Sequence, residues 1–125
     1  MGMTTKANLI AVTIDCDEPR KMAEFYHQVT GLPITYAEDE YAAVSDGSTS
    51  LYFGRVPDRK PVEWPGPDKQ FHLDFRVPDV GKAVEEYLAI GATKPDFQPG
   101  VTDEGVGWIV LRDPDGHLFC VCPEK

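Results

Sequence analysis

Two stretches of the chain alternate apolar and polar side chains with the period of two that is typical of a β-strand. In the stretch FHLDFRVPDV one face carries the apolar side chains of Phe71, Leu73, Phe75 and Val77. The opposite face of that stretch carries His72, Asp74 and Arg76. Near the N-terminus, Ile10, Val12 and Ile14 alternate in the same way with Ala11, Thr13 and Asp15. We expect each apolar face to pack on a helix and each polar face to meet either solvent or a binding cavity.

An amphipathic segment follows each of these two strands. The first segment begins after Asp17, has Pro19 in its first turn and ends at Gly31. The second begins at Asp79, a good N-cap residue, and ends at Gly91. Apolar side chains recur at intervals of three and four residues in both segments, so the sequence predicts two helices.

A strand, a tight turn and a second strand are predicted after each helix, at residues 40–56 and 107–122. The turns contain Asp-Gly pairs, which favour hairpins. A weaker strand is predicted at 33–38, and its counterpart at 93–99 is interrupted by prolines. Four prolines mark residues 57–69 as a linker.

The predicted fold class is therefore α+β, with two βαβββ modules in a single domain that spans residues 1–125. The first module covers about 7–56, and the second covers about 70–123.

The paired modules, with AEFY…TG at 23–31 and DPDG at 113–116, resemble the vicinal oxygen chelate superfamily. That superfamily includes glyoxalase I, bleomycin-resistance proteins and extradiol dioxygenases. The resemblance implies a curved mixed sheet of eight strands around a cleft, with the helices outside. It also implies a homodimer.

Metal-dependent members of this superfamily take ligands from four positions, which the resemblance assigns here to Ala11, Leu51, His72 and Cys120. Alanine and leucine side chains have no lone pair to donate, whereas a catalytic divalent ion needs about three protein ligands. Asp74, and Cys122 on the same face as Cys120, could complete an atypical site. We expect no metal and no other cofactor, and we assign no catalytic residue, although His72 could act as an acid or base.

The predicted ligand-binding residues are those expected to face the cleft. Alternation from Leu51 and from Cys120 places Phe53 and Cys122 there. Trp64, in the linker, is predicted to cover the cleft mouth or to contact a partner chain. The predicted set is Thr13, Phe53, His72, Asp74, Trp108, Cys120 and Cys122.

Composition excludes some classes of partner. The net charge of −9 argues against nucleic-acid binding. No apolar run approaches the roughly 20 residues that cross a membrane, and the N-terminus lacks a secretory signal pattern. Three cysteines are an odd number, which does not suit a disulfide framework, so we expect a cytoplasmic protein.

Three functions follow from these expectations. The first is a metal-free protein that binds or sequesters a small aromatic or drug-like molecule, as antibiotic-resistance members of the superfamily do. The second is a glyoxalase-like lyase or isomerase, or a dioxygenase, with an atypical metal site at His72 and Cys120. The third is a regulatory module whose cleft binds no ligand.

Overall fold

The computed structural model describes residues 4–124 and divides the chain into two compact units, 1–57 and 58–125. Both units are α+β, which confirms the predicted class. In the first unit the elements are β1 (Val12–Cys16), α1 (Pro19–Thr30), β2 (Ile34–Ala37), β3 (Tyr41–Ser45) and β4 (Ser50–Arg55). The sheet order is β1-β4-β3-β2, with β1 parallel to β4 and the other pairs antiparallel. The first module is therefore a mixed βαβββ sheet, as predicted.

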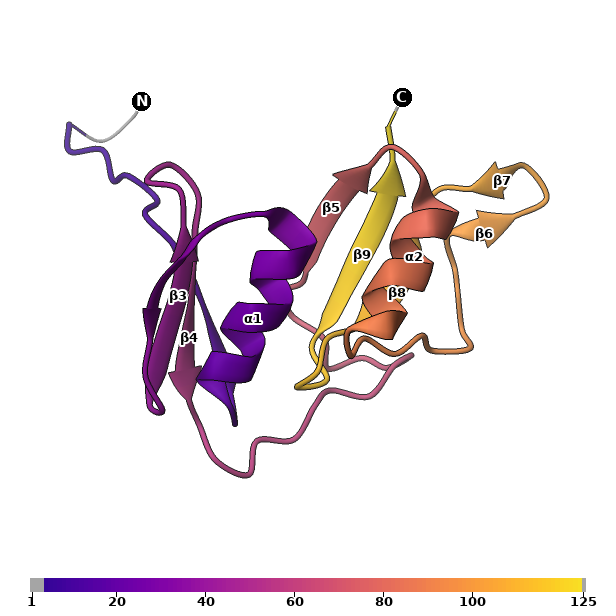
Figure 1. Ribbon diagram of the computed structural model, residues 1–125. Helices are drawn as coiled ribbons and strands as arrows, with labels where there is room; N and C mark the ends of the chain where they lie inside the picture. The colour runs from indigo at the N-terminus through magenta and orange to yellow at the C-terminus, as the bar shows by residue number, and fades with distance from the viewer. Residues whose placement is uncertain (1–3, 125) are drawn as a thin grey trace. The chain divides into compact units, whose positions relative to one another are not determined.

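Helix α1 covers one face of this sheet (Figure 1). Pro19 stands in its first turn, where a missing N–H breaks no helical hydrogen bond. Gly31 ends the helix in the left-handed conformation, with φ of 78°, and its N–H donates to the carbonyl oxygen of His27. Met22, Phe25 and Tyr26 are almost completely buried against the sheet, so the periodic apolar face of the sequence is the core face.

The second unit repeats this plan with changes after its helix. Its elements are β5 (Leu73–Val77), α2 (Val80–Ala89), β6 (Val101–Thr102), β7 (Gly105–Val106), β8 (Ile109–Arg112) and β9 (Leu118–Pro123). The sheet order is β5-β9-β8, with β5 parallel to β9 and β8 antiparallel to it. Strands β6 and β7 form a separate small hairpin that projects from the unit (Figure 1).

The weak strand considered at 93–99 does not form. One isolated bridge between Thr93 and Arg112 is all that remains of it. Pro95 and Pro99 have no N–H to donate to a neighbouring strand. The side chain of Gln98 instead bonds both the N–H and the carbonyl oxygen of Val110, each at 2.8 Å. The second sheet therefore has three strands, not four, and the two sheets together have seven strands where the resemblance implied eight.

The core of the second unit lies between its sheet and α2. Phe119, which is fully buried, contacts Phe75 of β5 and Tyr87 of α2, with ring centroids 5.8 and 6.4 Å apart. Asp79 caps α2 by accepting a hydrogen bond from the N–H of Lys82. The apolar face predicted for the stretch 71–80 therefore belongs to the core at Phe75, whereas Phe71, predicted on the same face, is 94% exposed and lies before the strand begins.

The proline-rich segment 58–70 packs against the turn between β8 and β9. The guanidinium of Arg59 donates to a carboxylate oxygen of Asp115 at 2.6 and 2.9 Å, and both side chains are largely buried. Gly116 has φ of 92°, and a Cβ there would lie 2.6 Å from Pro61. Glycine is therefore required both by the turn and by the close approach of the segment. We call residues 58–70 the strap.

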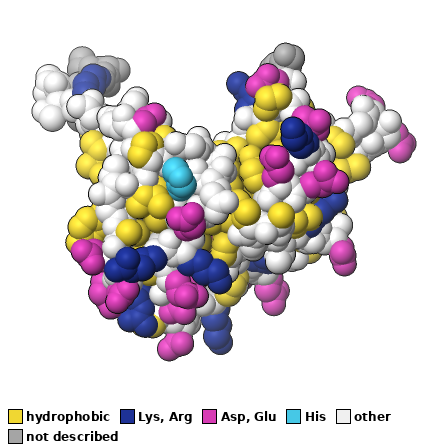
Figure 2. Space-filling view, viewed as in Figure 1, with side chains coloured by type: hydrophobic (Ala, Val, Ile, Leu, Met, Phe, Trp, Pro, Cys, Tyr) yellow, Lys and Arg dark blue, Asp and Glu magenta, His cyan; other side chains and the backbone are white. Residues whose placement is uncertain are grey.

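The surface carries charged side chains of both signs. Figure 2 shows acidic and basic groups interspersed on the viewed face, and the first unit contains the exposed ion pairs Arg20–Asp39 and Arg55–Glu40. Across residues 4–124, neither helix has the length and apolar character needed to span a bilayer.

Candidate ligand-binding site

A cavity of about 320 Å³ lies in the second unit. Its floor is the face of the β5-β9-β8 sheet that α2 does not cover. The strap and the long connection between α2 and β8 form its walls. Its lining residues are Trp64, Lys69, His72, Asp74, Pro99, Trp108, Val110, Leu118, Cys120 and Cys122.

Strand register explains how the floor residues meet. Asp74 of β5 pairs with Cys120 of β9, and Cys120 pairs with Val110 of β8. Residues paired across neighbouring strands point to the same side of a sheet. Because Phe75 and Phe119, their chain neighbours, face the helix, these three side chains must face the cavity.

Two tryptophans line the walls. The indole Nε1 of Trp64 donates to the carbonyl oxygen of Phe97 at 3.1 Å, which links the strap to the opposite wall. The ammonium of Lys69 lies over the Trp64 ring, 5.4 Å from its centroid. Trp108 packs so closely on Gly100 that a Cβ there would lie 2.5 Å from the indole. Glycine is thus required at position 100 for Trp108 to lie where it does.

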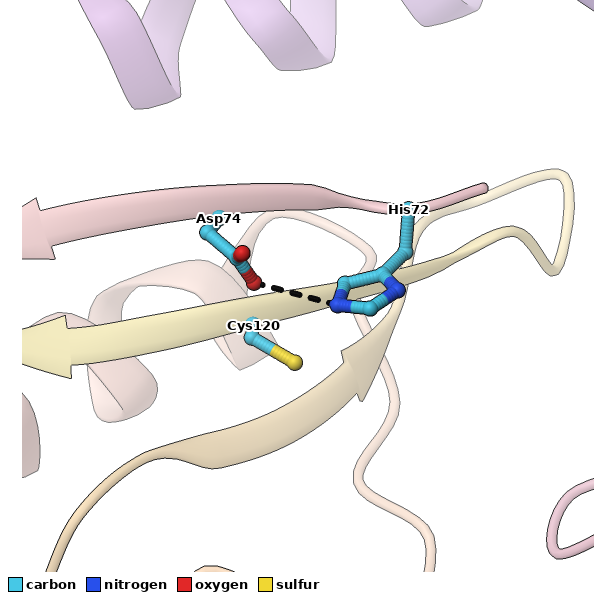
Figure 3. Close-up of side chains that lie close together, drawn as sticks. All are labelled: His72, Asp74 and Cys120. Carbon is cyan, nitrogen blue, oxygen red and sulfur yellow. Dashed lines mark ion pairs between the residues drawn. The ribbon is translucent and has the colours of Figure 1, made fainter. Parts of the chain in front are cut away.

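Three polar side chains converge at one end of the floor. His72 Nε2 and Asp74 Oδ1 are 3.2 Å apart, and Cys120 lies beside them, pointing toward the same space (Figure 3). One ligand atom from each residue can be chosen so that all three lie within 4.8 Å of one another. Imidazole, carboxylate and sulfur are all groups that bind zinc.

The thiol in this cluster is held in its protonated form. Burial, the negative charge of Asp74 and a hydrogen bond to that carboxylate together raise the pKa of Cys120 to about 12. Burial and Asp74 also raise the pKa of Cys122, which nearby Arg76 partly opposes. At neutral pH both side chains are therefore neutral thiols with little nucleophilic character.

Five of the seven predicted ligand-binding residues line this one cavity. They are His72, Asp74, Trp108, Cys120 and Cys122. Trp64, predicted to cover a cleft mouth, is part of its wall. The other two predicted residues, Thr13 and Phe53, belong to the first unit and do not line it.

The predicted orientation of Phe53 is wrong. Phe53 is fully buried and stacks on Tyr26 of α1, with the ring centroids 5.6 Å apart. It therefore lies on the helix-covered side of the sheet. Thr13 does point to the uncovered side, where Tyr52 is its partner in the parallel register.

The cause of this error is a difference in turn length. Four residues, 46–49, separate the paired ends of the first hairpin, Ser45 and Ser50. Five residues, 113–117, separate Arg112 and Leu118 in the second. The one-residue difference moves each following side chain to the other face. Consequently Tyr52, and not Leu51, corresponds to Cys120.

Four lining residues were not predicted. Leu118 lies two residues before Cys120 in β9, and Val110 is paired with Cys120 across the sheet, so both lie on the same face as Cys120. The correct strand register would therefore have identified them as cavity residues. Lys69 and Pro99 lie in irregular segments, where alternation gives no signal.

Three tyrosines lie together on the uncovered face of the first sheet. Tyr41 contacts both Tyr36 and Tyr52, with ring centroids 5.6 and 5.9 Å apart. Partial burial, together with the neighbouring Tyr52 and Tyr36, raises the pKa of Tyr41. Tyr36 is 48% exposed and Tyr41 37% exposed. We call these three residues the tyrosine face.

Comparison with protein families agrees with this geometry. The sequence profile of the glyoxalase-like domain matches residues 11–122, which include both modules and the whole cavity floor. The chain belongs to the glyoxalase-like family. This confirms the resemblance to the vicinal oxygen chelate superfamily. No curated protein sequence matches the glyoxalase-like chain significantly.

Solved structures share the fold of this glyoxalase-like protein. A glyoxalase/bleomycin resistance protein/dioxygenase family enzyme from Burkholderia phytofirmans PsJN has a TM-score of 0.69 and 22% identity, over 94% of this chain and 98% of that one. TioX from Micromonospora sp. ML1 has a TM-score of 0.61 and 18% identity, over 95% and 100%. The bleomycin-binding protein of Streptomyces verticillus, solved with copper(II)-bleomycin, has a TM-score of 0.56 and 15% identity, over 98% and 100%. At these identities the likeness concerns the fold.

Proposed function

We propose that this glyoxalase-like protein binds and sequesters a small, flat organic molecule in the cavity of its second unit, without a metal. The observation that supports this most is the lining itself. Two tryptophans and several aliphatic side chains surround about 320 Å³, with Lys69, His72 and Asp74 as charged or polar groups. A mostly apolar pocket of this size with a few polar groups is typical of small-molecule sites.

The donor set supports binding without a metal. Ala11, at one of the four superfamily positions, has no ligand atom, and Tyr52 offers only a phenol at another. Cys120, at a third, is a buried thiol where metal-dependent members of the superfamily typically have a glutamate. The bleomycin-binding protein with this fold shows that such a scaffold can hold a drug. Resistance to a toxic compound is the corresponding cellular role.

Binding is tested by isothermal titration with flat aromatic probes and by the melting temperature. A ligand that binds only the folded protein raises the melting temperature. We expect Trp108→Ala to weaken binding by about tenfold or more, because an aromatic contact is lost. The matched control is Phe71→Ala, which removes an aromatic ring that is 94% exposed and does not line the cavity, and it should leave affinity unchanged. Equal loss in both variants, or no binding by any flat probe, would reject the proposal.

The alternative function is a metal-dependent lyase, isomerase or dioxygenase. It is favoured by one observation, the three donor atoms of His72, Asp74 and Cys120 within 4.8 Å of one another. These donor types fit zinc or a similar soft divalent ion, which would displace the thiol proton. When bound, the ion would supply Lewis-acid polarisation of a ligand oxygen.

Elemental analysis of protein purified without chelators separates the two functions. A stoichiometric ion that is lost in both Asp74→Asn and Cys120→Ser would support the metal site and overturn metal-free binding. Retention of zinc by both variants would mean that the ion is not held by this cluster.

We also propose that the protein is a homodimer. The tyrosine face supports this, because a cluster of exposed aromatic side chains is typical of interaction surfaces. Sedimentation analysis should show two chains per particle, and Tyr41→Glu should shift the particle toward one chain. A monomeric wild-type protein would reject this proposal.

The remaining partner and location proposals rest on charge and cysteines. The net charge of −9 supports the absence of nucleic-acid binding. Cys16, Cys120 and Cys122, which all lie in the described part of the chain, are not in disulfide bonds, and this supports a reducing compartment such as the cytoplasm. Cell fractionation and a filter-binding assay with duplex DNA test these two points.

A further inference from the structure

Lys69 places a positive charge inside the cavity, against an aromatic ring. Its ammonium lies 5.4 Å from the centroid of the Trp64 ring, which is another lining residue. The face of an indole ring carries negative potential and attracts cations. The Lys69 side chain thus marks a position in this cavity where a positive charge is stabilised.

The two charges that line the cavity differ in how firmly they are held. Asp74 lies in the middle of β5, and its backbone is paired in register with Cys120 of β9. Its carboxylate contacts His72 and Cys120, yet 63% of the side chain is exposed. Lys69 is an exposed residue outside the strands, with its charge at the end of a long flexible side chain. The negative charge is therefore the fixed one, and the positive charge is movable.

The geometry points to a flat organic cation as the ligand of this cavity, with its positive group replacing the Lys69 ammonium on Trp64 and facing Asp74. This inference rests on the proposed function and adds the chemical class of the ligand. Displacing Lys69 costs little, because an exposed cation–π contact is a weak interaction.

Further features favour a ligand that is both flat and positive. Trp64 and Trp108 both line the cavity and offer large ring surfaces for stacking. The net charge of −9 raises the concentration of cations near the protein. For an anionic ligand the lining offers the positive charge of Lys69, but the ligand would also approach the Asp74 carboxylate.

The test uses three probes of nearly equal size and different charge. N-methylquinolinium is the cation, 1-methylnaphthalene is its neutral isostere and 1-naphthoate is the anion. Isothermal titration of the full chain should show the cation binding about tenfold more tightly than the neutral probe. That preference should fall as salt rises from about 20 mM to about 0.5 M. This salt dependence can be measured on the wild-type protein alone.

Two variants and their charge-matched controls locate the effect. Asp74→Asn should reduce the preference for the cation, whereas Glu85→Gln, on the exposed side of α2, should leave it intact. Lys69→Met should strengthen cation binding about threefold by removing the internal competitor, and should leave the neutral probe unaffected. Lys82→Met is the control for this second change.

Each contrary result has a distinct meaning. Equal affinity for the cation and the neutral isostere would overturn the inference and leave the proposed function standing. Tightest binding of 1-naphthoate, lost in Lys69→Met, would overturn it in favour of an anion site. If none of the three probes binds, both the inference and the proposed function fail.

Discussion

The uncovered faces of the two sheets come from the same module plan but have different chemistry. On the first sheet, Thr13, Tyr52 and Tyr41 present hydroxyl and phenol groups. On the second sheet, Asp74 and Cys120 occupy the positions that correspond to Thr13 and Tyr52. The corresponding residues thus change from a hydroxyl and a phenol to a carboxylate and a thiol.

The walls also distinguish the two faces. Ten residues, 31–40, connect α1 to β3, and they include the edge strand β2. Nineteen residues, 90–108, connect α2 to β8, and they supply Pro99 and Trp108 to the cavity. The strap supplies Trp64 and Lys69 to the opposite wall. The elements common to both modules therefore make only a floor, and the strap together with the longer connection between α2 and β8 converts one floor into a cavity.

The largest expected effect compares the cores of the two units. Phe119→Ala and Phe53→Ala should each lower the free energy of unfolding by about 3–5 kcal/mol, because each removes a fully buried ring. Urea denaturation followed by circular dichroism measures both changes. Phe71→Ala, which removes a ring that is 94% exposed, is the control and should cost much less. An effect of Phe53→Ala as small as that of the control would contradict its placement in the core.

A second comparison concerns ion pairs of different burial. Arg59→Met should cost about 1.5–3 kcal/mol, because it removes charged hydrogen bonds to the largely buried Asp115. Arg20→Met breaks an exposed pair with Asp39 and should cost no more than about 1 kcal/mol.

Limited proteolysis gives a second readout for Arg59. Loss of the Arg59 bonds should speed cleavage within residues 58–70, whereas Arg20→Met should not. Unchanged cleavage of the strap in Arg59→Met would show that other contacts hold it in place.

The smallest expected effect concerns the thiol of Cys120. Its pKa is raised to about 12, so at pH 8 almost none of it is the reactive thiolate, and alkylation by iodoacetamide should be slower than for an ordinary cysteine. Asp74→Asn removes the charge that opposes ionisation, so it should speed alkylation severalfold; burial, the largest cause, remains. Mass spectrometry of the peptide that contains Cys120 measures the rate.

The raised pKa of Cys120 also determines how the stability of the folded protein changes with pH. Because the folded-state pKa lies above the unfolded value of 9.0, the neutral thiol favours folding at pH values below 9. That contribution declines as pH rises from 9 toward 12. Cys120→Ser should therefore lose less stability than the wild-type protein over this range, and an identical loss would contradict the shift.

Much of the local structure could be predicted from the sequence. Helix α1 ends at the residue before Gly31, and α2 begins after Asp79 and ends two residues before Gly91. The alternation around Asp74 correctly separates core from cavity. These features depend on interactions within a few residues, such as caps, turns and side-chain periodicity. These local patterns also identified most of the predicted residues that form the floor of the cavity.

Tertiary structure decided the rest. The orientation of Phe53 depends on a hairpin one residue shorter than its counterpart, which alternation alone does not reveal. Lys69 and Trp64 reach the cavity in a strap that is held by contacts with distant segments, such as that of Arg59 with Asp115, 56 positions away along the chain. Sequence periodicity describes which side chains share a face, but contacts between distant segments decide which of those faces becomes a cavity.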